Sequence, residues 1–150
     1  MKVPFLTGGN VSRPLVEWLG EREEVSVSGE RLGADDVASL APDVIVSHSY
    51  PHILTRDVLV ATPGWFVNLH VSLLPFNRDE DPNFWSFIDD MPKGVTVHRI
   101  DQGIDAGPIL LQREVSFAAS GETLASTPIA GIHYARKQRV DHRPGRTRLH

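Results

Sequence analysis

The chain has 150 residues, of which 41% are hydrophobic and 23% charged, and its formal net charge of −4 gives no general case for nucleic-acid binding. This length and composition are those of one ordinary globular domain with its own core. The absence of cysteine excludes disulfides, thiolate metal sites and a cysteine nucleophile, and with no secretory leader or long apolar run we expect a cytoplasmic protein without membrane contact.

The first part of the chain alternates short strands with short helices. Strands are expected at 3–6, 25–28, 43–47 and 66–70, and helices between Ser12 and Gly20, at 34–40 and near 55–59. Ser12 should cap the first helix and Pro14 should open it. Gly8 and Gly9 predict a tight turn, because neither a G-x-G-x-x-G spacing nor a Walker lysine accompanies them. The alternation predicts an α/β fold with an open, mainly parallel sheet flanked by helices.

The second part of the chain continues the sheet and then changes character. We expect a helical aromatic stretch at 83–88, strands at 95–100 and 109–115, and a turn at 101–108 between them. From Thr127 onward six arginines and lysines face a single aspartate, and neither helical nor strand periodicity remains. The sequence therefore predicts one domain at 1–126 and an irregular basic tail at 127–150.

Candidate chemistry gathers at the ends of two strands. Asn68 and His70 are two residues apart, so a strand would place both side chains on one face at its carboxyl end, where α/β proteins concentrate function. Gly103 and Gly107 allow a tight turn that can aim the carboxylate of Asp105. A solvated polar edge and a solvated connection would give the same two patterns, so each needs the other as support.

Two other kinds of site find little support. The four histidines before residue 100 lack the i, i+4 pairing of a zinc helix, so we expect no metal. Ser72 lacks the G-x-S-x-G context of a hydrolase nucleophile.

Three motifs follow one another in order: N-L-H-V-S-L-L-P at 68–75, G-V-T-V-H at 94–98 and D-Q-G-I-D-A-G at 101–107. Together they resemble the formyltransferases that use 10-formyltetrahydrofolate, a family that includes glycinamide ribonucleotide and methionyl-tRNA formyltransferases. D-P-N-F-W-S-F at 81–87 and P-K-G-V-T at 92–96 are most similar to the branch that N-formylates nucleotide-linked amino sugars for surface polysaccharides. The resemblance covers about residues 1–126 and implies a Rossmann-like fold.

The resemblance assigns roles to individual residues. The family's catalytic asparagine, histidine and aspartate fall on Asn68, His70 and Asp105. An amide donor and an imidazole can stabilise the formyl oxygen while an amine attacks, and Asp105 can hold the imidazole and help relay the amine proton. The implied folate pocket comprises His52, Ile53, Leu54, Asp101, Gln102, Gly103 and Ile104. The implied sugar contacts are Arg78, Asn83 and Trp85.

The chain departs from the family at two places that bear on whether the site can bind its substrate. Asp79 and Glu80 follow Arg78, where relatives have a basic residue and then glycine. Relatives also continue the helix at 122–124 into a region that binds the sugar nucleotide or forms a homodimer, whereas here Thr127 and Pro128 interrupt it. We expect a truncated chain whose reading frame shifted near 126–128; a functional basic tail is the other explanation. An alternate frame encoding the rest of that helix would support the shift.

The resemblance implies an N-formyltransferase whose acceptor is the amine of a nucleotide-linked amino sugar, with no nucleic-acid partner. Two alternatives stay open. One is a catalytically impaired remnant that still binds folate. The other is a small amide or formyl-folate hydrolase, which also needs an oxyanion site.

Overall fold

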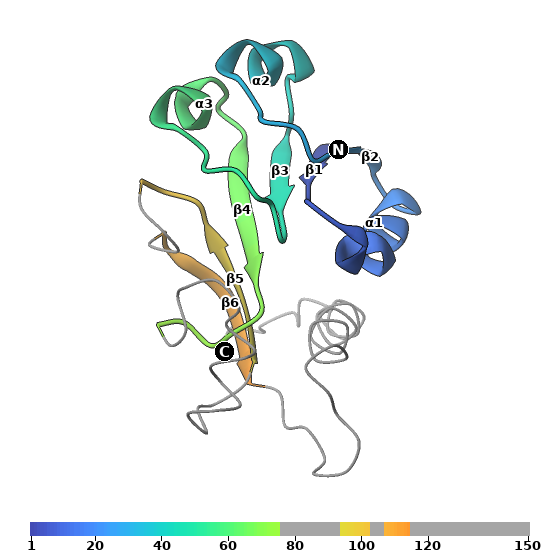
Figure 1. The fold of residues 1–150 in the computed structure, drawn as a ribbon, viewed down its shortest axis with the longest axis vertical. Helices are drawn as coiled ribbons and strands as arrows, with labels where there is room; N and C mark the ends of the chain where they lie inside the picture. The colour runs from blue at the N-terminus through green and yellow to red at the C-terminus, as the bar shows by residue number, and fades with distance from the viewer. Residues whose placement is uncertain (76–93, 103–106, 115–150) are drawn as a thin grey trace, which may run out of the picture.

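The computed structural model of the protein describes residues 1–75, 94–102 and 107–114 (Figure 1). These residues form a six-stranded sheet in the order β2-β1-β3-β4-β5-β6. The strands are β1 (Lys2–Leu6), β2 (Glu24–Ser28), β3 (Val44–Ser47), β4 (Trp65–His70), β5 (Gly94–Arg99) and β6 (Ile109–Glu114). The helices are α1 (Arg13–Gly20), preceded by the 3₁₀ turn η1 (Asn10–Ser12), α2 (Ala34–Leu40) and α3 (Arg56–Val60).

The sheet is parallel in its first part and antiparallel in its second. β1 pairs with β2 and β3, and β3 with β4, in parallel register. β5 runs antiparallel to β4, and β6 antiparallel to β5. The predicted α/β class with an open, mainly parallel Rossmann-like sheet is confirmed, and the predicted strands and helices of the first part are found within two residues of their expected ends.

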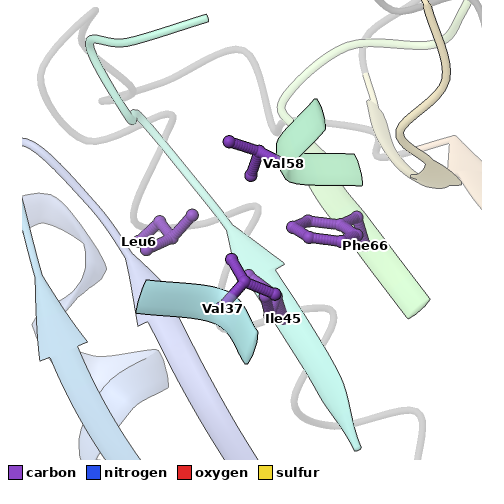
Figure 2. Packing of buried hydrophobic residues seen from close by; sticks show 5 residues of the cluster. All are labelled: Leu6, Val37, Ile45, Val58 and Phe66. Atoms are coloured by element: carbon purple, nitrogen blue, oxygen red, sulfur yellow. The ribbon is translucent and has the colours of Figure 1, made fainter. Parts of the chain in front are cut away.

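Helices cover both faces of the sheet, because neighbouring residues of a strand point to opposite sides. Leu6, Ile45 and Phe66 pack on one face against Val37 of α2 and Val58 of α3 (Figure 2). The other face buries a second cluster of Phe5, Leu15 and Leu69, to which α1 contributes Leu15. Burial on both faces explains why these strands are almost continuously apolar in sequence.

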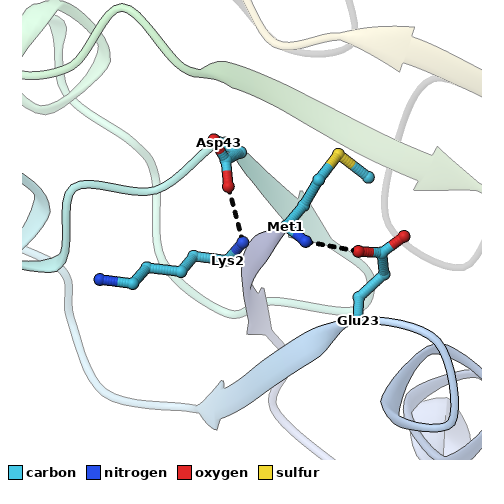
Figure 3. Close-up of polar contacts among 4 residues, drawn as sticks. All are labelled: Met1, Lys2, Glu23 and Asp43. Carbon is cyan, nitrogen blue, oxygen red and sulfur yellow. Dashed lines mark hydrogen bonds and ion pairs between the residues drawn. The ribbon is translucent and has the colours of Figure 1, made fainter.

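The amino end of β1 is tied to both neighbouring strands (Figure 3). The Met1 ammonium group forms an ion pair with the Glu23 carboxylate at 2.6 Å, and the Lys2 backbone N–H donates to Asp43 Oδ2 at 2.7 Å. Glu23 immediately precedes β2 and Asp43 immediately precedes β3. These contacts help to set the register of β1 against its neighbours. Because they are exposed, they add little to stability.

Gly107 is required where the chain returns toward β6. A Cβ atom at this position would overlap the carbonyl oxygen of Arg99, and the Arg99 N–H donates to Pro108 O at 2.9 Å. Backbone must therefore move to admit any side chain.

We expect Gly107→Ala to lower the free energy of unfolding by about 2 kcal/mol, because it displaces hydrogen-bonded backbone between β5 and β6. Urea unfolding at neutral pH measures the change. Gly20→Ala is the control, since a Cβ at Gly20 in α1 meets no atom of the described residues within 4 Å and alanine favours a helix. Equal stability of wild type and Gly107→Ala would contradict this expectation.

Several sequence predictions fall outside the described residues: the aromatic helix at 83–88, the helix beginning near 121 and the basic tail at 127–150. Within the described ranges, none of the helices has the length and apolar character needed to cross a bilayer.

Candidate functional site

Asn68 and His70 lie on one face of β4, where His98 of β5 joins them. Asn68 is directly opposite His98 in the strand register, and Asn68 Nδ2 lies 3.2 Å from His98 Nε2. The His70 and His98 rings have centroids 6.5 Å apart and planes at 73°. The structure therefore places a side-chain amide and two imidazoles together at the carboxyl end of β4.

This cluster is largely shielded from solvent. His98 is 1% exposed and His70 is 9% exposed, while Asn68 is half-buried. Polar contacts here compete little with bulk water, so each one orients its side chain more strongly than it would at the surface.

Thr96, opposite His70 in the register, fixes the chain immediately after β4. Its hydroxyl donates to Ser72 O at 2.7 Å and accepts from the Leu74 N–H at 3.2 Å. Gln112 Nε2 of β6 donates to the same hydroxyl and to Leu74 O. The segment that directly follows His70 is thus held by side chains from both β5 and β6.

The two loops predicted to bind folate are both anchored at the core cluster beneath α2 and α3. Leu54 from the first loop and Ile100, just before the second, both pack against that cluster. Ile100 is anchored further by its N–H, which donates to Phe66 O at 2.8 Å. Ile53 is 77% exposed, and Asp101 and Gln102 are exposed as well. The structure therefore anchors both loops, through Leu54 and Ile100, on the sheet face covered by α2 and α3, which also carries Asn68.

Tyr50 holds the first of these loops in place. Its hydroxyl donates to Glu30 O at 2.6 Å and accepts from the Leu32 N–H at 3.0 Å. The His52 ring lies edge-on to the Tyr50 ring, with 5.2 Å between centroids. Tyr50 has no role that its local sequence indicates, because its partners are backbone atoms about twenty residues away.

The remaining predicted site residues lie outside the described part of the chain. They are the catalytic Asp105, the pocket residues Gly103 and Ile104, and the sugar contacts Arg78, Asn83 and Trp85. Within the described residues there is no group of three histidine, aspartate or glutamate side chains that could hold a metal ion.

The prediction that Ser12 caps α1 with its side chain is wrong. Ser12 has helical backbone angles of −80° and −9°, because η1 leads directly into α1, whereas a capping side chain needs extended backbone. Its hydroxyl instead lies 2.6 Å from His48 Nδ1 and 2.8 Å from Thr7 Oγ1. Ser12 is therefore part of a buried polar chain that joins the ends of β1 and β3.

His48 at the end of that chain is neutral at neutral pH. It is 1% exposed, and among the residues that the structure describes its buried Nε2 atom has no hydrogen-bond partner. Burial, followed by electrostatic repulsion from His70, lowers the pKa of His48 to about 4. Sequence alone gave no sign of this, since His48 stands in a polar stretch that reads as a surface loop.

The cluster is suited to acyl-type chemistry. The Asn68 amide supplies N–H donors, and the His70 imidazole can carry and pass on a proton. Side by side in a partly dry site, such groups can stabilise an oxygen on which negative charge develops.

Comparison of the sequence with known proteins identifies the family of this chain. The sequence model of the formyl transferase family matches residues 22–128. Methionyl-tRNA formyltransferase from Roseiflexus castenholzii is 44% identical over 89 residues, which are 59% of this chain and 28% of that protein. The corresponding protein of Halorhodospira halophila is 36% identical over 128 residues, 82% of this chain and 41% of that protein.

Among solved structures, the formyltransferase PseJ from Anoxybacillus kamchatkensis is similar with a TM-score of 0.77 and 31% identity, over 93% of this chain and 75% of that one. That protein was crystallised with UDP-4,6-dideoxy-4-formamido-L-AltNAc and tetrahydrofolate. Glycinamide ribonucleotide transformylase 1 from Symbiobacterium toebii shares the fold at 17% identity, with a TM-score of 0.73.

The chain spans less than half the length of the two curated relatives named above. The family match nevertheless covers most of this chain, including β4 and β5 with Asn68, His70 and His98. The chain belongs to the formyl transferase family.

Proposed function

We propose that this chain transfers a formyl group from 10-formyltetrahydrofolate to a primary amine, with Asn68, His70 and Asp105 as catalytic residues. The observation that carries the proposal is the placement of Asn68 and His70 on one face of β4 at its carboxyl end, in a member of the formyl transferase family. An amide donor beside an imidazole is what attack on a formyl carbon requires.

In the proposed reaction the amine nitrogen forms a bond to the formyl carbon, and the bond from that carbon to folate N10 breaks. Asn68 donates a hydrogen bond to the formyl oxygen while the carbon is tetrahedral, and His70 stabilises the same oxygen. The proton lost by the amine reaches N10 through His70 and Asp105, directly or through water. No covalent enzyme intermediate is required.

We place the folate against the loops that carry His52–Leu54 and Asp101–Ile104. The exposed Ile53 offers an apolar surface for a flat heterocycle, and the backbone on either side offers hydrogen-bonding groups. Both loops are anchored on the cluster beneath α3, which supports a pocket formed before the ligand arrives.

Tyr50→Phe tests the placement of the first loop. Loss of the hydroxyl leaves Glu30 O and the Leu32 N–H without this partner, so we expect tetrahydrofolate to bind roughly fivefold more weakly, equivalent to one hydrogen bond. Calorimetric titration measures the affinity. Glu30→Ala is the matched control, because it keeps the backbone carbonyl that accepts from Tyr50. If Tyr50→Phe and Glu30→Ala bind equally, the loop does not shape the pocket.

The acceptor we favour is the amine of a nucleotide-linked amino sugar. The likeness to PseJ, whose crystals contain such a formylated sugar nucleotide, supports it. The 44% identity to a methionyl-tRNA formyltransferase favours a second candidate, the amino group of methionyl-tRNA. In the first case Arg78, Asn83 and Trp85 are the proposed contacts to the sugar nucleotide.

One assay separates these possibilities. The purified chain is incubated with 10-formyltetrahydrofolate and, in parallel, with a panel of nucleotide-linked amino sugars, with methionyl-tRNA and with no acceptor. Mass spectrometry should show a formyl group on one of the sugars. Formylated methionyl-tRNA would show that the acceptor is methionyl-tRNA and not an amino sugar. Formate released without an acceptor would indicate a hydrolase. Tetrahydrofolate binding without any transfer would identify a binding remnant and overturn the proposed activity.

A further inference from the structure

We propose that His98 is a positioning residue that fixes the orientation of the Asn68 amide, an inference that rests on the proposed function of Asn68. Every side-chain amide has two nearly isosteric ends, one that donates and one that accepts hydrogen bonds. A rotation that exchanges them would turn an oxyanion donor into an acceptor. Something in the site must therefore select one orientation.

The backbone partner of His98 determines which of its two ring nitrogens carries the hydrogen. His98 Nδ1 lies 2.9 Å from the carbonyl oxygen of Arg99, and a carbonyl can only accept, so Nδ1 carries the hydrogen. In a neutral imidazole the other nitrogen, Nε2, is then an acceptor.

This tautomer selects one end of the Asn68 amide. Nε2 of His98, as an acceptor, requires a donor at 3.2 Å, and the Nδ2 end of Asn68 supplies it. The opposite orientation would set the Asn68 carbonyl oxygen against the lone pair of Nε2, which is repulsive. Fixing Nδ2 toward β5 also fixes the side on which its second hydrogen and the amide oxygen lie, and this second N–H is the proposed donor to the formyl oxygen.

The ring that makes this choice is itself held firmly. His98 is 1% exposed and follows an irregularity in the pairing of β5 with β6 at Val97 and His98. The Arg99 backbone is anchored by its N–H, which donates to Pro108 O at 2.9 Å, and the Arg99 guanidinium lies over the Trp65 ring at 4.7 Å. A fixed carbonyl thus fixes the tautomer, and the tautomer fixes the amide.

The first test is spectroscopic and needs no catalysis. In the full chain labelled with ¹⁵N, the two ring nitrogens of His98 should show the Nδ1–H tautomer near neutral pH. A scalar coupling across the hydrogen bond should connect His98 Nε2 to Asn68 Nδ2. An Nε2–H tautomer would overturn the inference even if formyl transfer is observed. The expected tautomer would uphold the positioning geometry even if no acceptor is formylated.

The second test compares two substitutions of His98 by steady-state kinetics. In His98→Gln the side-chain oxygen can stand where Nε2 was and accept from Asn68, whereas His98→Leu fills similar space without an acceptor. We expect His98→Leu to lower kcat about 10²-fold, with KM for the folate nearly unchanged, and His98→Gln to restore most of that loss. Equal losses in both variants would show a purely structural role and contradict the proposal.

Discussion

His70→Ala is expected to lower kcat for formyl transfer roughly 10²–10⁴-fold, the range for loss of a positioned acid–base group. Asn68→Ala should cost roughly 10²–10³-fold, as expected for one oxyanion donor. Both side chains meet the reacting formyl group in the proposed mechanism, so kcat should fall more than the affinity for tetrahydrofolate. Steady-state kinetics with the best acceptor, together with calorimetric folate titration, measures the two effects separately.

Two further variants sharpen this comparison. Asn68→Asp keeps the shape of the side chain but removes its N–H donors, so it should be as inactive as Asn68→Ala. Arg13→Ala, which breaks an exposed ion pair with Glu17 on α1, should leave turnover unchanged. Because His70 is 9% exposed, circular dichroism must confirm that each variant folds. Near-normal turnover in folded His70→Ala and Asn68→Ala would refute the site.

Stability should fall steeply when the pH drops from about 6.5 to about 4, and His48 should account for about 3 kcal/mol of that loss. In the folded chain the pKa of His48 is lowered to about 4, whereas in the unfolded chain it has the ordinary value of 6.5. Between these values the unfolded state binds the additional proton and is favoured. The contribution of His48 is complete above pH 6.5 and is lost as the pH approaches 4. Urea unfolding across this range measures it.

The surroundings of His48 give this prediction its control. Its Nδ1 atom faces the Ser12 hydroxyl, and Thr7 lies one hydrogen bond further. Electrostatic repulsion from His70 adds to the effect of burial in lowering its pKa. His48→Phe preserves a flat ring but cannot titrate, so its unfolding free energy should depend less on pH over the same range, although Ser12 loses one partner. If wild type and His48→Phe lose the same stability between pH 6.5 and 4, His48 is not the titrating group.

The residue expected to control stability in acid, His48, lies close to the proposed catalytic residue His70 in the fold. His48 directly follows β3, His70 ends β4, and electrostatic repulsion from His70 contributes to the lowered pKa of His48. Acid conditions should therefore destabilise the fold next to β4, the strand that carries the proposed catalytic residues. Measurements of formyl transfer at low pH need a parallel measurement of folding.

Local sequence signals were sufficient for the first part of the fold. α2 begins and ends at the residues that its pattern predicts, with Asp35 and Asp36 in its first turn. β3 is β-branched and almost continuously apolar, a pattern typical of a buried parallel strand, and it pairs in parallel with β1 and β4. These features depend on neighbours along the chain, so the sequence contains them directly.

The one clear failure shows where local reasoning stops. Ser12 has the residue type and spacing of a helix cap, but its hydroxyl bonds to His48, 36 residues further along the chain. A hydroxyl with two possible hydrogen-bond partners bonds to the one that the fold brings closer. Spacing along the chain does not predict the distance to a partner that is remote in sequence.

By itself the sequence determined the α/β class, the strand that carries Asn68 and His70, and the motifs that resemble those of formyltransferases. These follow from side-chain alternation and from ordered residue types, which are one-dimensional properties. Only the tertiary structure decided that His98 lies opposite Asn68, that Tyr50 holds the loop of His52, and that His48 is buried and neutral. Each of these depends on the register between strands or on burial, which arise only when distant segments pack together.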